Sequence, residues 1–239
     1  MTNSDNNNKP LTLAIDIGGS KIKMLVLNAS GEPVTERTRC ETPRPAVPDG
    51  ILKAIESQLG QHGDFDRISI GFPGVVIDGV TINAANLDEE WQGFNLAKAV
   101  RDMAFVPVRV ANDADIQGYG AIRGHGVELV VTLGTGFGSS LFVDGQLVPN
   151  LELGHHIFEH DLTYEQRLGQ AARKESGNKE WRARLKRAIN QLEALFNPTT
   201  IYIGGGNAKK IKSELPANVE TSENIAGILG GIKLWGDDS

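Results

Sequence analysis

The sequence contains a single cysteine, Cys40, and no long apolar run among its 239 residues. One cysteine excludes an intrachain disulfide framework and a multi-cysteine metal site, so a reducing compartment is expected. No stretch reaches the length that crosses a membrane, and residues 1–10 are polar, which argues against a signal peptide. We therefore expect a cytoplasmic protein without membrane partners.

Positive charge is also scarce. The chain has 24 Lys and Arg residues against 30 Asp and Glu residues, which gives a formal net charge of -6. Binding to a nucleic-acid backbone needs clustered Lys and Arg, so no nucleic-acid partner is expected. With 40% hydrophobic residues the chain can bury a substantial core, in one domain or two small ones, and small molecules are the better candidate partners.

Two parts of the sequence share one pattern. From Leu11 to Leu27, apolar runs flank Gly18-Gly19, and a similar pattern returns from Leu129 to Val148. Each copy predicts a β-meander. A duplication at about half the chain length predicts two similar domains that face each other across a ligand-binding cleft.

Strands and helices are predicted to alternate along the rest of the chain, so the fold class is α/β. The helical segments are Gly50–Leu59, Asn95–Met103, Leu162–Leu195 with a break near Gly177-Asn178, and Asn224–Trp235; the others are strands at 68–72, 106–111 and 201–203 and a hairpin at 75–82 around Asp78-Gly79. The predicted divisions are a disordered tail at 1–10, an N-terminal lobe at 11–112 that a terminal helix at 224–236 could complete, and a C-terminal lobe at 113–223.

The segment from Asp16 to Lys21 combines a carboxylate at a strand end with Gly18, Gly19 and Ser20. Glycines let backbone N–H groups approach an anion closely, and a carboxylate at this position can hold Mg²⁺. The alternative interpretation is an ordinary hairpin turn with a surface Asp.

A second glycine-rich turn contains Gly134, Gly136 and Gly138. Each glycine costs a strand interior about 0.5–1 kcal/mol relative to Ala, so some requirement should select that backbone. Neither turn matches the P-loop pattern, and the second also misses the dinucleotide-binding pattern. Because both turns occupy matching points of the repeat, we interpret them together as a phosphate clamp.

Asp113 follows the predicted strand at 106–111, at a position where side chains reach a crevice at the strand ends. Phosphoryl transfer needs a group that orients the attacking hydroxyl and accepts its proton. One alternative is that Asp113 is only a helix N-cap. Another is that Asp115 is the functional carboxylate, although its different offset should point it elsewhere.

Two further segments carry candidate ligand-binding residues. Glu152 and His155, followed by further His and Glu residues, have no HExxH pattern, so a hydrogen-bonding patch for a polyol is favoured over a metal site. A solvated loop is the alternative. Gly204-Gly205-Gly206 follows a predicted strand and permits close approach of a ring or a phosphate, although such clusters are also common turns.

In order, these segments resemble the ROK family of sugar kinases within the actin-like ATPase superfamily, and most closely its compact polyphosphate-glucokinase-like branch. The resemblance covers Leu11 to Trp235. Its motifs are Asp16–Ser20, Gly71–Gly74, Asn86-Leu87, Asn112–Asp115, Leu133–Gly138, Glu152–His155, and Asn197-Pro198 leading to Gly204–Gly206. The resemblance implies a two-lobed, ribonuclease H-like fold with duplicated mixed sheets around a central cleft.

The resemblance also implies an activity. It is the transfer of a phosphoryl group from ATP or polyphosphate to a hexose, glucose at O6, with Mg²⁺, by a homodimer in which Asp113 is the general base. The implied sugar-binding residues are Asn86, Asn112, Asp113, Glu152, His155 and Glu165. The implied donor-binding residues are Asp16, which would also serve the metal, and Gly18, Gly19, Ser20, Lys21, Gly134, Thr135, Gly136, Gly138, Gly204, Gly205 and Gly206.

Departures from the family pattern affect these expectations. The zinc-binding cysteine cluster of many ROK proteins is absent, so no zinc is expected, and Lys21 replaces the usual Gly of the polyphosphate branch, so the donor stays open. ROK proteins include sugar-sensing repressors, but these carry an added DNA-binding module, whereas about ten polar residues precede the first predicted strand here. A non-catalytic sugar-binding relative is the third class, disfavoured by the intact motifs.

Overall fold

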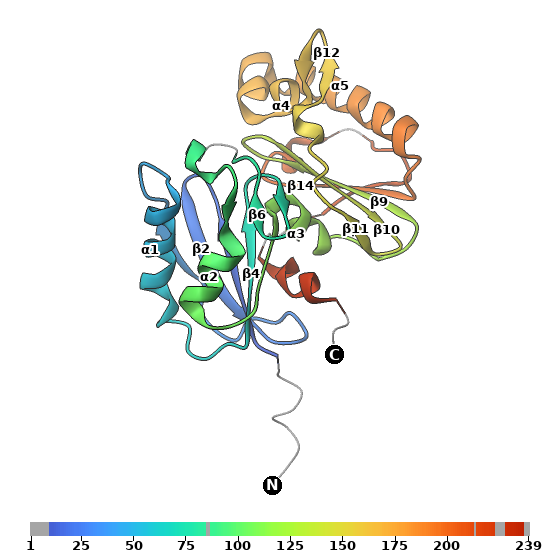
Figure 1. Ribbon diagram of the computed structural model, residues 1–239. Helices are drawn as coiled ribbons and strands as arrows, with labels where there is room; N and C mark the ends of the chain where they lie inside the picture. The colour runs from blue at the N-terminus through green and yellow to red at the C-terminus, as the bar shows by residue number, and fades with distance from the viewer. Residues whose placement is uncertain (1–9, 85–86, 213, 223–227, 237–239) are drawn as a thin grey trace. The chain divides into compact units, whose positions relative to one another are not determined.

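The computed structural model describes residues 10–84, 87–212, 214–222 and 228–236. The chain forms two compact units (Figure 1): unit 1 comprises Met1–Tyr119 and Ala226–Ser239, and unit 2 comprises Gly120–Ile225. Of the predicted tail at 1–10, only Pro10 lies within the described residues. In these ranges, no helix combines the length and the apolar character that crossing a membrane requires.

Unit 1 is built on a five-stranded mixed sheet in the order β3-β2-β1-β4-β8. The strands are β1 (Thr12–Ile17), β2 (Lys21–Leu27), β3 (Thr38–Glu41), β4 (Arg67–Phe72) and β8 (Val108–Asn112). The first three pair antiparallel, which confirms the predicted meander, while β4 runs parallel to β1 and β8 runs parallel to β4. The carboxyl ends of β1, β4 and β8 therefore meet at one edge of the sheet.

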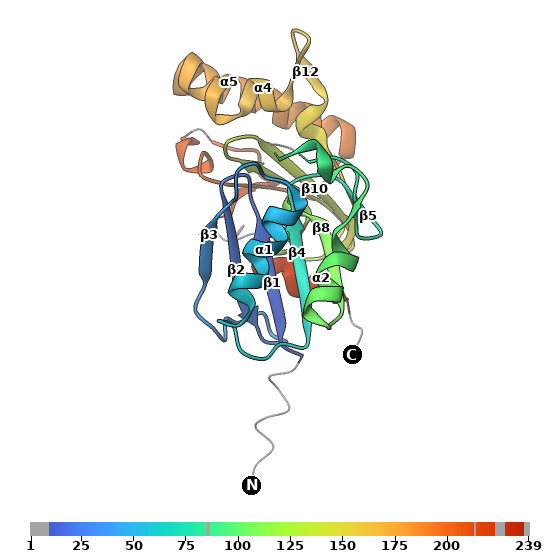
Figure 2. The same ribbon diagram turned by 60° about the vertical axis from the view of Figure 1, so that its left-hand side comes forward.

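Helical segments cover both faces of this sheet (Figure 2). On one face, α1 (Pro48–Leu59) and α2 (Leu96–Ala104) bury their apolar side chains against alternate residues of the central strands. The opposite face is covered by α3 (Asp113–Tyr119) and by a 3-10 helix, η4 (Leu229–Trp235), which is the described part of the predicted terminal helix. Two hydrogen bonds connect Ser69 of β4 to η4. The Ser69 hydroxyl donates to the Gly231 carbonyl at 2.6 Å and accepts from the Trp235 indole at 2.8 Å.

Short elements complete unit 1. Strands β5 (Val76–Ile77), β6 (Val80–Thr81) and β7 (Phe94–Asn95) form a small antiparallel sheet, and a 3-10 turn, η1, spans Glu89–Trp91. Asp78 and Gly79 both have positive φ, 51° and 77°, as a two-residue hairpin turn requires. The predicted hairpin is therefore confirmed.

Unit 2 contains a second five-stranded sheet, in the order β11-β10-β9-β14-β15. Its strands are β9 (Val127–Leu133), β10 (Phe137–Val143), β11 (Gln146–Val148), β14 (Thr200–Gly204) and β15 (Val219–Thr221). Again the first three form an antiparallel meander, and the last two run parallel to β9. Because strand order and direction match those of unit 1, the predicted duplication is confirmed; the predicted cleft stays a prediction.

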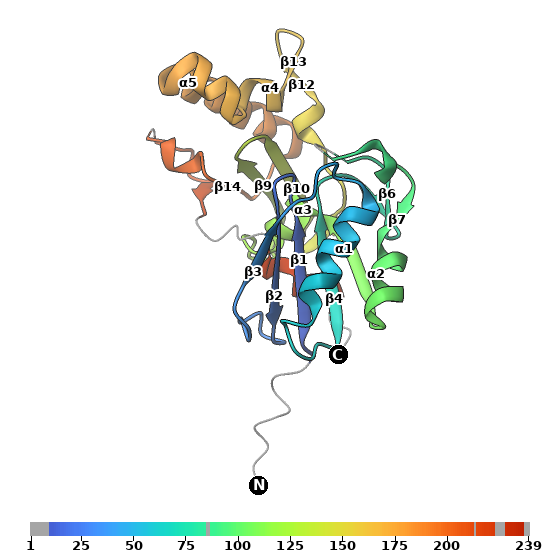
Figure 3. The same cartoon turned by 90° about the vertical axis from the view of Figure 1, so that its left-hand side faces the viewer.

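Helices pack on the unit 2 sheet (Figure 3). These are α4 (Tyr164–Leu168) and the long α5 (Gln170–Phe196), with a hairpin of β12 (Ile157–Glu159) and β13 (Leu162–Thr163) and the 3-10 turns η2 (Leu153–His155) and η3 (Ala208–Lys210). Buried Trp181 and Leu185 of α5 pack against Leu129 and Val131 of β9. The backbone of α5 breaks at Gly177, where φ is 77° and ψ is 161°, at the predicted position.

The compact units divide between Tyr119 and Gly120, whereas the predicted lobe boundary at residue 112 precedes α3. Packing explains why α3 falls in unit 1. A Cβ atom added at Gly230 of η4 would lie 1.9 Å from the Ile116 carbonyl oxygen, so α3 and η4 are in intimate contact.

A buried carboxylate fixes the loop before β9. Glu128, 1% exposed, accepts the backbone N–H groups of Arg123 (2.8 Å), Gly124 (2.7 Å) and His125 (3.0 Å) and the hydroxyl of Tyr202 (2.9 Å). Burial acts to raise the pKa of Glu128, but these four hydrogen bonds hold it below its ordinary value.

We predict that Glu128→Gln lowers the free energy of unfolding at pH 7 by about 2 kcal/mol or more, because an amide leaves buried donors unsatisfied. The wild-type contribution is present above pH ~4.3 and is lost as pH falls through the lower folded pKa. Urea titrations between pH 7 and pH 3 measure both effects. Exposed Glu56→Gln is the control, and equal losses for the two variants would contradict the assignment.

Candidate active site

The turn between β1 and β2 has its carbonyl groups bound by neighbouring residues. The Gly18 carbonyl accepts the Thr42 hydroxyl at 2.6 Å, the Gly19 carbonyl accepts Arg44 Nη2 at 2.6 Å, and the Ser20 carbonyl accepts the Thr42 N–H at 2.9 Å. In the described part of the chain, the N–H groups of Gly19 and Ser20 have no protein acceptor. A turn with bound carbonyls and open N–H groups favours an anionic ligand.

The charged residues of this first turn form ion pairs. Asp16, whose side chain is 14% exposed, accepts Lys23 Nζ at 2.7 Å across the β1–β2 pair. Lys21 Nζ lies 3.4 Å from a carboxylate oxygen of Glu41 on β3. Sequence reasoning missed Lys23; the available signal was that it lies opposite Asp16 in a hairpin centred on Gly19 and Ser20.

The turn between β9 and β10 has the same arrangement. The Gly134 carbonyl accepts Asn207 Nδ2 at 2.9 Å, and the N–H of Gln170, the first residue of α5, lies 3.1 Å from the carbonyls of both Gly134 and Thr135. Among the described residues, no acceptor faces the N–H groups of Thr135 or Gly136. Both predicted phosphate turns therefore present open N–H groups.

The third glycine segment lies beside the second turn. Gly204, the last residue of β14, and Gly138 on β10 both pair with Thr132 of β9. Gly205 has a φ of 83°, and a Cβ atom there would lie 2.5 Å from a β9 carbonyl oxygen, so only glycine fits. A Cβ at Gly206 would meet nothing within 4 Å. These glycines and the second turn share one edge of the unit 2 sheet.

Asn112, the last residue of β8, caps the helix that begins with Asp113. Its Oδ1 atom accepts the N–H groups of Ala114 at 2.7 Å and Asp115 at 3.4 Å, and its Nδ2 atom donates to the Gly74 carbonyl at 3.1 Å. This is N-cap geometry, in which the residue before the helix binds the N–H groups of its second and third residues. The alternative that Asp113 is the N-cap is therefore wrong.

Asp113 lies at the same strand-end edge as the first turn. Gly71 on the intervening strand β4 pairs with Asp16 on one side and Ala111 on the other, and a Cβ added to Gly71 would lie 3.7 Å from Asp113 Cβ. Asp115, the competing carboxylate, is 1% exposed and turned into the interior. Of the two acids, the half-buried Asp113 is therefore the better candidate for contact with a ligand.

The predicted polyol-binding side chains of unit 2 also lie together. Glu152 Oε2 is 3.3 Å from His155 Nε2, and Glu165 accepts the Phe137 N–H at 3.3 Å, against Gly136 of the second turn. Burial raises the pKa of Glu152; His155 opposes this effect, and the nearby Glu165 carboxylate adds to it.

The neighbouring Glu159 is separate from this cluster. Its carboxylate binds Arg167 at 2.6 Å and Arg187 at 2.9 Å. Across residues 10–236, with their gaps, no three His, Cys, Asp or Glu side chains form a group able to hold a metal ion.

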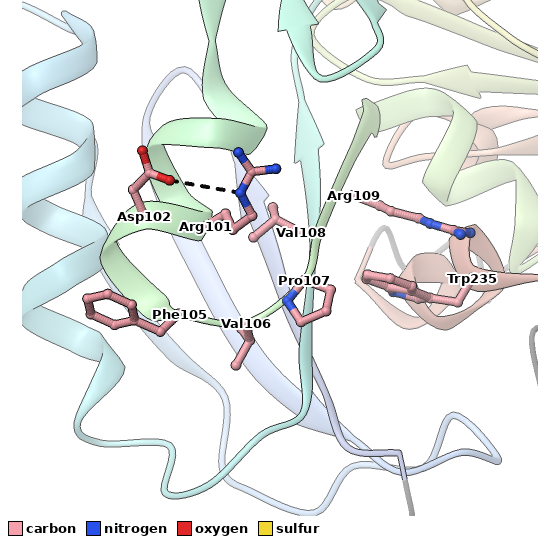
Figure 4. Close-up of a pocket in the computed structure, with 8 residues that line it drawn as sticks. All are labelled: Arg101, Asp102, Phe105, Val106, Pro107, Val108, Arg109 and Trp235. Atoms are coloured by element: carbon pink, nitrogen blue, oxygen red, sulfur yellow. Dashed lines mark ion pairs between the residues drawn. The ribbon is translucent and has the colours of Figure 1, made fainter.

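Two hollows concern the described residues of unit 1. One, of about 320 Å³, is lined by Asn83, Asp88 and Glu89 among others; the predicted sugar ligand Asn86 lies outside the described residues. The other, of about 760 Å³, lies between the end of α2, the start of β8 and Trp235, over whose ring the Arg109 guanidinium stacks at 4.6 Å (Figure 4). That second hollow contains none of the predicted site residues.

We predict that Asn112→Ala lowers the free energy of unfolding by about 1–2 kcal/mol, because α3 loses its cap. Asp113→Asn should cost less than Asn112→Ala, since the cap stays in place. Chemical denaturation of both variants measures the difference. A larger loss for Asp113→Asn would contradict the assignment of the cap.

Comparison with known proteins agrees with these features. Residues 12–164 match the ROK family. The polyphosphate glucokinase of Mycobacterium leprae is 31% identical over 233 residues, which cover 90% of this chain and 72% of that protein, and its Mycobacterium tuberculosis counterpart is 30% identical over 233 residues, 90% of this chain and 88% of that protein. The crystal structure of an inorganic polyphosphate/ATP-glucomannokinase from Arthrobacter sp. strain KM matches with a TM-score of 0.83 and 31% identity, over 94% of this chain and 97% of that one. The chain therefore belongs to the ROK family and has the duplicated mixed-sheet fold of its actin-like sugar kinases.

Proposed function

We propose that this protein is a hexose kinase that transfers a phosphoryl group from ATP or polyphosphate to a hexose, with glucose O6 as the acceptor. The observation that carries the proposal is the pair of glycine turns with bound carbonyls and open N–H groups, the first of which shares a sheet edge with Asp113. The names of its relatives, two polyphosphate glucokinases and a polyphosphate/ATP-glucomannokinase, support the same class of reaction.

Asp113 is the general base of this proposal. The acceptor hydroxyl gives its proton to the Asp113 carboxylate as its oxygen bonds to the terminal phosphorus, and the bond from that phosphorus to the rest of the donor breaks. Asn112 holds Asp113 in place through the α3 cap and Gly74, besides its predicted contact with the sugar. The proposed sugar ligands of unit 2 are Glu152, His155 and Glu165.

The donor phosphates bind the open N–H groups. Gly18 to Lys21 form the first proposed phosphate contact and Gly134 to Gly138 the second, while Gly204 to Gly206 line the adenosine side of the donor. Asp16 fits Mg²⁺ that arrives with the donor, because Mg²⁺ commonly takes one or two carboxylates together with substrate phosphates and water. When bound, the ion would neutralise donor charge. The homodimer and the cytoplasmic location stay part of the proposal.

We predict that Asp113→Asn lowers kcat by about 10²- to 10⁴-fold with little change in hexose affinity, because it removes the base and keeps the shape. A coupled assay for sugar phosphate, with ATP, GTP or polyphosphate as donor and glucose, mannose, fructose or glucosamine as acceptor, measures it. The comparison variant is Asp115→Asn, assayed below both melting temperatures. Near-normal kcat for Asp113→Asn would remove Asp113 from the base role, and no transfer by the wild type from any donor would overturn the kinase proposal.

A second prediction concerns pH. In its charged form the Glu152 carboxylate accepts hydrogen bonds from sugar hydroxyls, and the pKa of Glu152 is raised. As the pH is lowered, KM for the hexose should therefore begin to rise at a pH above about 4.3, the ordinary pKa of Glu. The Glu152→Gln variant should have a higher KM that lacks this pH dependence. Steady-state kinetics between pH 4.5 and pH 8 distinguish the two profiles, and parallel profiles would contradict a sugar-binding role.

A further inference from the structure

One group of basic residues comes from the two chain segments that bind the second glycine turn of unit 2 through Gln170 and Asn207. We call it the basic surface; its members are Arg173, Lys174, Arg182, Lys209, Lys210 and Lys212. The four lysines are exposed and the two arginines are half-buried. The net charge of -6 does not reveal this surface, because its members come from two segments that are distant in the sequence. Three of them lie on α5 and three follow β14.

The six side chains of the basic surface form no ion pairs with described residues. Within the described ranges, none of its six side chains lies within 4.0 Å of a carboxylate oxygen. Several basic side chains elsewhere do have such partners, among them Lys53, Lys98 and Arg187. Like charges gathered without counter-charges create a positive potential that attracts an anion.

Hydrogen bonds join the basic surface to the second turn. Arg173 Nε donates to Asn207 Oδ1 at 3.0 Å, and Asn207, 5% exposed, donates to the Gly134 carbonyl at 2.9 Å. Arg182 Nη1 donates to the Lys210 carbonyl at 3.3 Å. Both chain segments that supply the cations are thus held beside the proposed donor site.

The kink of α5 places basic residues of both helix halves on this side. Across the break at Gly177, Arg173 Nη1 donates to Asn178 Oδ1 at 2.9 Å. Arg173 precedes this break and Arg182 follows it. The cations therefore extend as a row over both halves of α5 and residues 209–212 rather than occupying one compact pocket.

We propose that the basic surface binds the phosphate groups of an inorganic polyphosphate that lie beyond the transferred end, an inference that rests on the proposed function. Every phosphate of a polyphosphate is anionic, so a row of cations can bind the polymer along its length. ATP carries only three phosphates and continues into an uncharged base and sugar, for which such a row offers no matching charge.

The test compares two double variants of the full chain. Lys209→Gln/Lys210→Gln should raise KM for long-chain polyphosphate about tenfold, as expected when charge-assisted contacts are lost, and leave KM for ATP within about twofold. Values of kcat should not change with either donor. Lys53→Gln/Lys98→Gln removes the same charge from exposed sites of unit 1 and should alter neither KM.

Several results would overturn the assignment. These are an unchanged KM for polyphosphate, an equal rise for both donors, or a wild-type enzyme that accepts ATP alone, which would leave the kinase proposal standing. If the wild type uses neither donor, the kinase proposal fails, and binding of fluorescently labelled polyphosphate then tests the surface alone: weaker binding by Lys209→Gln/Lys210→Gln supports it, and equal or absent binding overturns it. A single-stranded oligonucleotide that binds as tightly, with the same lysine dependence, would assign the surface to nucleic acid.

Discussion

Both glycine turns must satisfy their carbonyl oxygens within the protein and still present N–H groups outward. The donors that bind these carbonyls come from segments far away in sequence: Thr42 and Arg44 in unit 1, and Gln170 and Asn207 in unit 2. A hairpin alone would leave its carbonyls to water and would repel an anion as readily as attract it. The site therefore depends on the packing that brings these donors to the turns.

The duplicated sheet supplies the same edge twice, and the residues that follow the strands differentiate the two units. In unit 1, β8 leads into Asn112 and Asp113, so the edge carries a capped helix and a carboxylate. In unit 2, β14 leads into Gly205 and then into Lys209 and Lys210, so that edge gains close backbone approach and positive charge. Under the proposed function, one sheet topology serves acid–base chemistry as well as phosphate binding in unit 1, and phosphate binding with added positive charge in unit 2.

The sequence was informative where local rules decide. Gly177 breaks a long helical pattern and Asp78-Gly79 closes a hairpin, and both follow from backbone preferences. It was uninformative where the fold joins distant segments. Asn and Asp are equally good N-cap residues, so the residue types alone do not distinguish Asn112 from Asp113 as the cap. The ion pair of Asp16 with Lys23 depends on the register of the hairpin. Net charge gave no indication of the basic surface, because a sum over the chain does not show cations that come from two segments.

The open N–H groups of both turns are the proposed binding groups for the donor phosphates. Titration of the ¹⁵N-labelled protein with ATP and with tripolyphosphate, followed by amide NMR, tests this role directly. If the turns bind the phosphates, the amide signals of Gly19, Ser20, Thr135 and Gly136 shift together and saturate at one ligand concentration. If these four signals stay in place while amides elsewhere shift, the turns are not the phosphate site.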